Sequence, residues 1–119
     1  MSERLSEDLL ALLGEEGLVR LAEALGGRRF YVPHAAHREH ALIEAVGEEL
    51  AARLTRRYAP AYLRIPLVRE LRARHYRAQG MSNGRIATML GITETAVDKI
   101  FARMKNPPAK GSAQLTLEI

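Results

Sequence analysis

The first quarter of the chain carries apolar residues at helical spacing. They fall into two stripes on either side of Gly14: Leu5, Leu9, Leu12 and Leu13, then Leu18, Leu21, Ala22 and Leu25. Because residues three and four positions apart share one face of a helix, the stripes predict two short helices, ended by Gly26 and Gly27. Residues 28–32 are aromatic and β-branched in part and stand between glycines and Pro33, which predicts a short strand.

A long amphipathic helix is predicted over residues 38–58. Its apolar positions trace one face, with charged residues elsewhere: Leu42, Ile43, Val46, Leu50 and Leu54. A chain of 119 residues offers little local surface to cover so long a stripe. We therefore expect these five side chains to be buried mostly in the interface of a homodimer, and dimerisation to be required for folding.

The strand pattern then recurs once. Residues 61–65 precede Pro66 just as residues 28–32 precede Pro33, so the pattern repeats after 33 residues. Two copies are too few for a solenoid fold. A basic helix is expected over residues 67–79, with Leu71 and Tyr76 as buried positions and Gly80 at its end. Residues 106–119 begin with Asn-Pro-Pro and are expected to form a flexible tail.

Residues 83–104 meet each requirement of a helix-turn-helix. Ser82 is placed to cap the first helix, and Ala87 is small enough for a close crossing of two helices. Gly91 stands where the chain must turn in a left-handed conformation, which costs other residues about 1 kcal/mol or more. The positions expected to face inward are apolar: Ile86, Ala87, Leu90, Ile92, Val97 and Ile100.

The second helix of this corner, capped by Thr93, leaves a polar face turned outward. Glu94, Thr95, Asp98 and Lys99 lie on that face, and the major groove is wide enough to admit a helix. We expect these four side chains to read base edges. Lys99 suits guanine, and Asp98 is able to accept a hydrogen bond from cytosine or to orient a neighbour.

The net positive charge is confined to the second half of the chain. Residues 1–60 hold 8 arginines against 10 acidic residues, a balance of −2, whereas residues 61–119 hold 10 basic against 4 acidic residues, a balance of +6. One end of the molecule is thus suited to phosphate and the other to protein. Phosphate contacts are expected from seven residues around the helix-turn-helix: Arg72, Arg77, Ser82, Arg85, Thr93, Arg103 and Lys105.

The composition narrows the remaining classes of function. The absence of cysteine excludes disulfides, thiolate metal sites and a cysteine nucleophile, and it fits a cytoplasmic protein. From the acidic, amphipathic first residues we expect neither a signal peptide nor a membrane helix. No arrangement of residues typical of a catalytic triad, a phosphate loop or a carboxylate metal pair is present, so we expect neither an enzyme nor a cofactor.

Three histidines follow the first predicted strand at a spacing of three: His34, His37 and His40. On a helix the first and last of them diverge from one face, so that only neighbouring pairs could share an ion. We expect no metal site here. Solvated histidines, or a hydrogen bond from His37 or His40 in the dimer interface, are the alternatives.

Four segments together resemble the Mor family of phage transcription activators, named for the middle-operon regulator of bacteriophage Mu. They are LGGRRFYVP at 25–33, IxxVGEExA at 43–51, YLRIP at 62–66, and the helix-turn-helix that follows RxxG at 77–80. The resemblance covers residues 18–104. It implies a homodimer with an intertwined helical N-terminal domain, a short strand in the linker near the DNA, which carries Tyr62 and Arg64, and a dyad site where RNA polymerase is helped to initiate.

The expected fold is mainly α, with a helical dimerisation domain at 1–58, a linker with a short strand at 59–66, a three-helix DNA-binding domain at 67–105 and the tail at 106–119. The expected function is that of a sequence-specific transcriptional regulator that binds duplex DNA as a homodimer. The alternative is a non-regulatory module, an architectural or phage-assembly protein, that uses the same corner for protein contacts.

Overall fold

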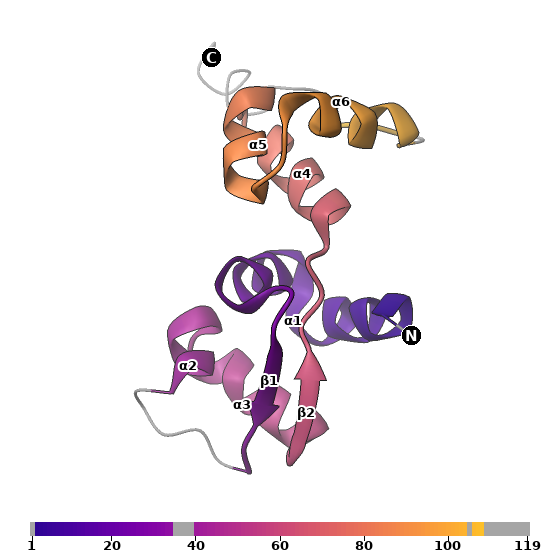
Figure 1. Ribbon diagram of the computed structural model, residues 1–119. Helices are drawn as coiled ribbons and strands as arrows, with labels where there is room; N and C mark the ends of the chain where they lie inside the picture. Colours follow the sequence, from indigo (N-terminus) through magenta and orange to yellow (C-terminus); the bar gives the residue numbers. More distant parts are fainter. Residues whose placement is uncertain (1, 35–39, 105, 109–119) are drawn as a thin grey trace, which may run out of the picture. The chain divides into compact units, whose positions relative to one another are not determined.

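A computed structural model describes residues 2–34, 40–104 and 106–108, which form a mainly helical protein with one two-stranded sheet (Figure 1). The chain divides into two compact units, Met1–Val68 and Arg69–Ile119. The expected mainly α fold is confirmed. None of the described helices is both long and apolar enough to cross a membrane.

The first helix, α1 (Ser2–Leu25), is broken in its middle. Gly14 has φ 80° and ψ 169°, values that no helical residue adopts, so two helical segments meet there as the two leucine stripes predict. Its buried residues come from both segments: Leu9, Leu13, Leu18, Val19, Leu21, Ala22 and Leu25. They form the greater part of the apolar core of the first unit.

Two short strands, β1 (Arg29–Val32) and β2 (Ala61–Arg64), pair in antiparallel register, with Arg29 opposite Arg64 and Tyr31 opposite Tyr62. Both were expected as strands, but their pairing was not. Two further hydrogen bonds extend the ribbon, from the Gly27 amide to the Ile65 carbonyl (2.7 Å) and from the Ile65 amide to the Arg28 carbonyl (2.9 Å). The segment expected as a linker therefore belongs to the first unit.

The prediction of one long helix over residues 38–58 is wrong. Two helices stand there, α2 (Ala41–Val46) and α3 (Glu48–Tyr58), because Gly47 has φ 89° and ψ 167°. This conformation is almost exclusive to glycine. Residues 38 and 39, where the long helix was expected to begin, lie outside the described residues.

The expected dimer interface also needs correction. Leu42 (1% exposed), Val46 (3%) and Leu54 (1%) are already buried within the single chain, while Ile43 and Leu50 are partly exposed. The break at Gly47 is the reason, because each short helix turns its own apolar face onto α1. Three of the five residues thus need no second chain to leave water.

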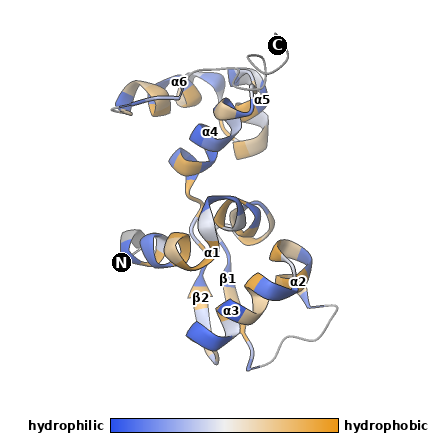
Figure 2. Cartoon of the chain, turned by 180° about the vertical axis from the view of Figure 1, so that it is seen from behind, coloured by the Kyte–Doolittle hydropathy of each residue, from blue (hydrophilic) through white to orange (hydrophobic). Residues whose placement is uncertain are grey.

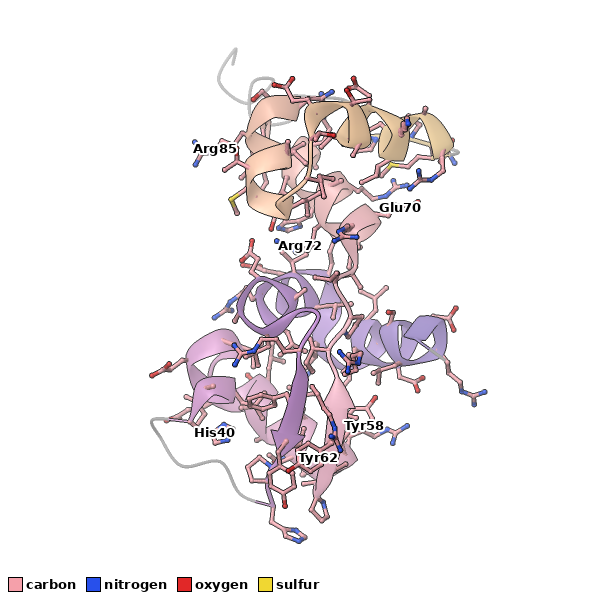
Figure 3. All side chains as sticks on the ribbon, in the orientation of Figure 1. His40, Tyr58, Tyr62, Glu70, Arg72 and Arg85 are labelled. Carbon is pink, nitrogen blue, oxygen red and sulfur yellow. The ribbon has the colours of Figure 1, made fainter. Side chains whose placement is uncertain are left out.

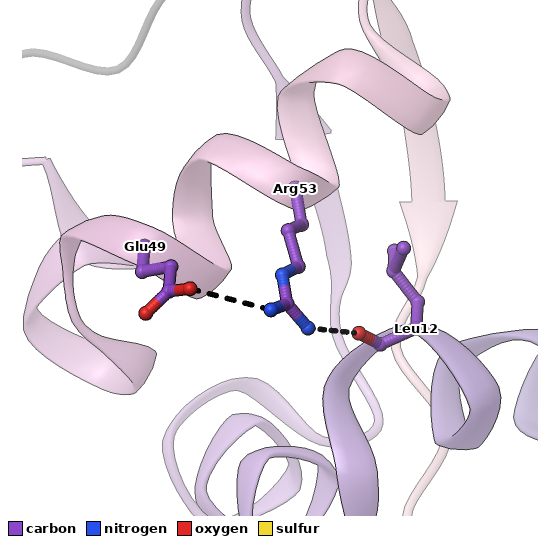
Figure 4. A network of polar contacts seen from close by, with 3 residues as sticks. All are labelled: Leu12, Glu49 and Arg53. Atoms are coloured by element: carbon purple, nitrogen blue, oxygen red, sulfur yellow. Dashed lines mark hydrogen bonds and ion pairs between the residues drawn. The ribbon is translucent and has the colours of Figure 1, made fainter.

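The junction between α1 and α3 is also tied by a polar contact (Figure 4). Arg53 donates one hydrogen bond to the Leu12 carbonyl (3.2 Å) and pairs with Glu49 at 3.3 Å. Leu12 lies in the last turn before the break at Gly14, where helical carbonyls lack partners within the helix. Because both charged side chains are well exposed, the ion pair contributes at most about 1 kcal/mol.

The described residues of the second unit form three helices: α4 (Arg69–Ala78), α5 (Asn83–Leu90) and α6 (Glu94–Arg103). Each packs against the other two. The helices carry hydrophilic residues beside the apolar ones that they bury (Figure 2). Tyr76 is buried as expected, whereas Leu71 is only partly covered.

We predict that Gly47→Ala lowers the free energy of unfolding by about 1–3 kcal/mol, because alanine must adopt a strained backbone at that position. No atom lies within 4 Å of the added methyl group, so the effect reports backbone strain alone. Urea unfolding followed by circular dichroism measures it. A single continuous helix would give the opposite sign, since alanine favours a helix interior over glycine by about 1 kcal/mol.

A second prediction concerns Tyr58, whose hydroxyl is shielded from solvent and has no hydrogen-bond partner among the described residues. Burial raises the pKa of this hydroxyl above its ordinary value of 10.0; nearby Arg57 lowers the pKa, and Asp8 raises it further. The folded chain therefore holds the proton more tightly than the unfolded chain. Its stability should begin to fall once the pH exceeds 10.0, where the unfolded tyrosine ionises.

Tyr58→Phe should remove this part of the alkaline loss and stabilise the protein at neutral pH as well, since an unpaired buried hydroxyl costs about 1 kcal/mol or more. Thermal unfolding at neutral pH and at pH values above 10.0 measures both effects. Tyr62→Phe is the control, because Tyr62 is 59% exposed. Equal alkaline loss in the Tyr58→Phe variant and the wild type would contradict the prediction.

Candidate nucleic-acid interface

The corner between α5 and α6 depends on three local features, two capping hydrogen bonds and one left-handed residue. The Ser82 hydroxyl accepts from the Arg85 amide (3.2 Å) and begins α5, and the Thr93 hydroxyl accepts from the Ala96 amide (3.1 Å) and begins α6. Gly91, between them, is left-handed with φ 71° and ψ 35°. These three predictions are confirmed.

Apolar side chains close the inner side of this corner. Five of the six positions expected to face inward are buried: Ile86, Ala87, Leu90, Val97 and Ile100. The sixth, Ile92 in the turn, is partly exposed. From α4, Ala73 (0% exposed) and Tyr76 (2%) complete the core. Met104, at the end of α6, is buried too and was not expected.

The outer face of α6 is polar and exposed. It carries Glu94, Thr95, Asp98 and Lys99, the four residues expected to read bases, together with Arg103. Ala102 lies on this exposed side as well and was missed, because a small apolar residue gives no signal of its own. Within the described part of the second unit, one side of α6 is thus left accessible to a ligand.

Asp98 is not a free acceptor. Its Oδ1 receives a hydrogen bond from Nδ2 of Asn83 in α5, so one carboxylate oxygen is already engaged across the corner. Asp98 was expected either to accept a hydrogen bond from cytosine or to orient a neighbouring side chain, and this contact corresponds to the second role. Glu94 comes close to Gly84, where an added Cβ would lie 3.2 Å from Glu94 Oε2. Sequence patterns did not point to Asn83 or Gly84, since both contacts join positions far apart in the chain.

Four of the seven residues expected to contact phosphate are exposed. Arg85 and Arg103 have exposed side chains, and Arg85 extends outward from α5 (Figure 3). Ser82 and Thr93 are exposed, although each hydroxyl already accepts from a backbone amide. Lys105 lies outside the described residues.

Arg72 requires correction as a phosphate contact, whereas the assignment of Arg77 stays a prediction. Arg72 is only 6% exposed, and its guanidinium donates to the Tyr76 hydroxyl (3.2 Å) and to the Met89 carbonyl (3.0 Å). Arg77 is half-buried, with its guanidinium carbon 4.6 Å from the ring centre of Phe101. Both side chains are used in packing the second unit, which removes Arg72 from the exposed basic surface.

In the first unit, the outer face of the strand ribbon presents Arg29, Tyr31, Tyr62 and Arg64, all exposed. The two tyrosine rings lie 5.0 Å apart, and the Arg29 guanidinium lies 4.3 Å from the centre of the Tyr62 ring. Arg64 donates to the Gly27 carbonyl at 3.2 Å. Tyr62 and Arg64, expected near DNA, are therefore accessible and part of one aromatic and basic surface.

His40 has a structural role that the histidine spacing did not suggest. Its Nδ1 accepts from the Leu42 amide (3.1 Å), which caps α2, and its ring meets Phe30 edge-on at 5.6 Å. His34 is exposed, and His37 lies outside the described residues. Among the described residues, no group of three potential metal ligands comes together.

Comparisons of the chain with protein-family models, with curated proteins and with solved structures give no match. The function of the corner is therefore inferred from its own residues and geometry.

We predict that Asn83 and Asp98 are energetically coupled. In a double-mutant cycle with Asn83→Ala and Asp98→Ala, urea unfolding should yield a coupling free energy of about 0.5–1.5 kcal/mol, the usual net value of a hydrogen bond. Asn83→Ala with Thr95→Ala is the matched control. Those two changes should be additive within about 0.5 kcal/mol, and similar additivity for Asn83 and Asp98 would contradict the contact.

Proposed function

We propose that this protein is a sequence-specific DNA-binding transcriptional regulator whose recognition helix is α6. One observation carries the proposal: the turn at Gly91 and the apolar inner side of the corner leave a continuous polar face on α6. A helix presented in this way fits the major groove, where each base pair offers its own pattern of donors and acceptors. The excess of basic residues in the same half of the chain supports a polyanionic ligand.

Thr95, Lys99 and Glu94 are proposed to reach base edges, together with Oδ2 of Asp98, the oxygen that does not accept from Asn83. Lys99 is suited to the guanine acceptors, and the carboxylates to the cytosine amino group. Arg85, Arg103, Ser82 and Thr93 are proposed as phosphate contacts, and Lys105, which lies outside the described residues, is kept as a further candidate. These contacts fix the position of the helix on the duplex but carry no sequence information.

A homodimer on a dyad site, with activation through RNA polymerase, completes the proposal. The resemblance of four segments to the Mor family supports it, and so does the exposed Arg-Tyr face of the ribbon, which would lie near the DNA through Tyr62 and Arg64. Ile43 and Leu50 keep partly exposed side chains that a second copy could cover. Since Leu42, Val46 and Leu54 are buried in one chain, the dimer would extend an existing core and not create it.

Selection from random duplex DNA tests the proposal, and we expect a dyad consensus with half-site centres about 34–36 Å apart, or a multiple of that distance. Footprinting on the selected site should show both half-sites protected. A single asymmetric half-site at saturation would overturn the dimeric part of the proposal. Failure to retain any duplex at low salt would leave the protein-interaction module as the explanation of the corner.

The salt dependence of binding should identify the phosphate contacts. Each contact adds about 0.9 to the slope of log affinity against log salt concentration, so Arg85→Ala should lower the slope by about one unit per subunit. Arg20→Ala, which removes the same charge from an exposed position on α1, is the control and should leave the slope unchanged. An equal loss of slope in both variants would show that only net charge matters.

A further inference from the structure

The C-terminal end of α5 leads through the Gly91 turn into α6, so its conformation affects the orientation of α6. The last carbonyl groups of α5 need hydrogen-bond donors from outside the helix. The last four carbonyls of a helix have no donor within the helix. The Ile92 amide donates to the Ala87 carbonyl (3.0 Å) and the Gly91 amide donates to the Thr88 carbonyl (3.3 Å). Backbone amides of the turn thus donate to the first two of these four carbonyls, those of Ala87 and Thr88.

The next carbonyl, that of Met89, accepts a hydrogen bond from a side chain of a different helix. Nη2 of Arg72 in α4 donates to it at 3.0 Å, 17 positions away in sequence. Nε of the same guanidinium donates to the Tyr76 hydroxyl at 3.2 Å. Arg72 (6% exposed) and Tyr76 (2%) are buried, and so is the bond between them, whereas the bond to the Met89 carbonyl is partly buried.

The chemistry of arginine suits this position. Its planar guanidinium has donors in fixed directions, so that a bond from Nε to Tyr76 also sets the direction of Nη2. A positive charge beside the last carbonyls of α5 is favoured by the negative end of the helix dipole. A lysine would supply the charge, but as a single ammonium group on a flexible stem it would not hold both partners.

We infer that Arg72 is a positioning residue: with Tyr76 it holds the last turn of α5 against α4, and thereby sets the orientation in which the Gly91 turn presents α6. Its link to DNA recognition rests on the proposed function; its effect on the turn does not. Arg72 makes no phosphate contact in this scheme. Its loss should therefore weaken specific binding through geometry and not through charge.

Amide hydrogen exchange tests the effect on the turn without DNA. In Arg72→Met, the Gly91 and Ile92 amides should exchange about tenfold faster relative to the Ala73 amide in α4, because the last turn of α5 opens more often. Arg69→Met is the matched control, with the same change at an exposed position of the same helix. Unchanged relative exchange in Arg72→Met would overturn the inference.

Binding to DNA tests the second part. Arg72→Met should lose about tenfold in affinity for the selected site, with affinity for unrelated duplex changed less than about twofold and the salt slope unchanged. A fall of the slope by about one unit per subunit would mean that Arg72 contacts phosphate, and would overturn the positioning role. If the wild type binds no DNA, the proposed function fails, while the exchange result still decides the role in the turn.

Tyr76→Phe covers the case in which Arg72→Met does not fold. It removes only the hydroxyl that fixes Nε and leaves the bond to Met89 possible. We expect a smaller change in the same direction, about twofold to fivefold faster relative exchange at Gly91 and Ile92. Exchange identical to the wild type would show that Tyr76 does not orient Arg72, and would overturn the proposed mechanism.

Discussion

The left-handed backbone at Gly91 is the constraint on which the second unit depends. It reverses the chain within the few residues between Leu90 and Glu94, and the amides that follow α5 turn back onto the carbonyls of Ala87 and Thr88. Ala87, small enough for the two helices to approach closely, is buried in this corner. The polar face of α6 is exposed as a result of this packing, since the opposite face is fully occupied by the core.

Local signals in the sequence predicted this corner well. Ser82 and Thr93 act through bonds to residues three positions away, and Gly91 acts through its own backbone. The apolar spacing predicted which side of each helix is buried. The break at Gly47 was missed because a glycine within an amphipathic pattern gives no sign of its φ angle. Without the break, one long stripe was assigned to a dimer interface that the chain largely covers by itself.

The functional side chains were predicted less well than the helices, because their accessibility depends on partners distant in the chain. Arg72 was assigned to phosphate since it is basic and near the corner, yet it is buried against Met89 of another helix. Asp98 is engaged by Asn83, 15 positions earlier. Charge counted along a sequence therefore overestimates the charge that the second unit offers to a ligand.

The pairing of β1 with β2 limits how the length of the chain can vary. Successive side chains of a strand point to opposite faces, so inserting or deleting one residue within β1 would exchange Arg29 and Tyr31 with Phe30 and Val32 between the two faces of the ribbon. A change of length between the strands would leave the phase intact. The strands should thus tolerate insertions and deletions less readily than the parts of their connection outside α2 and α3, because the phase of each strand determines which residues the surface displays.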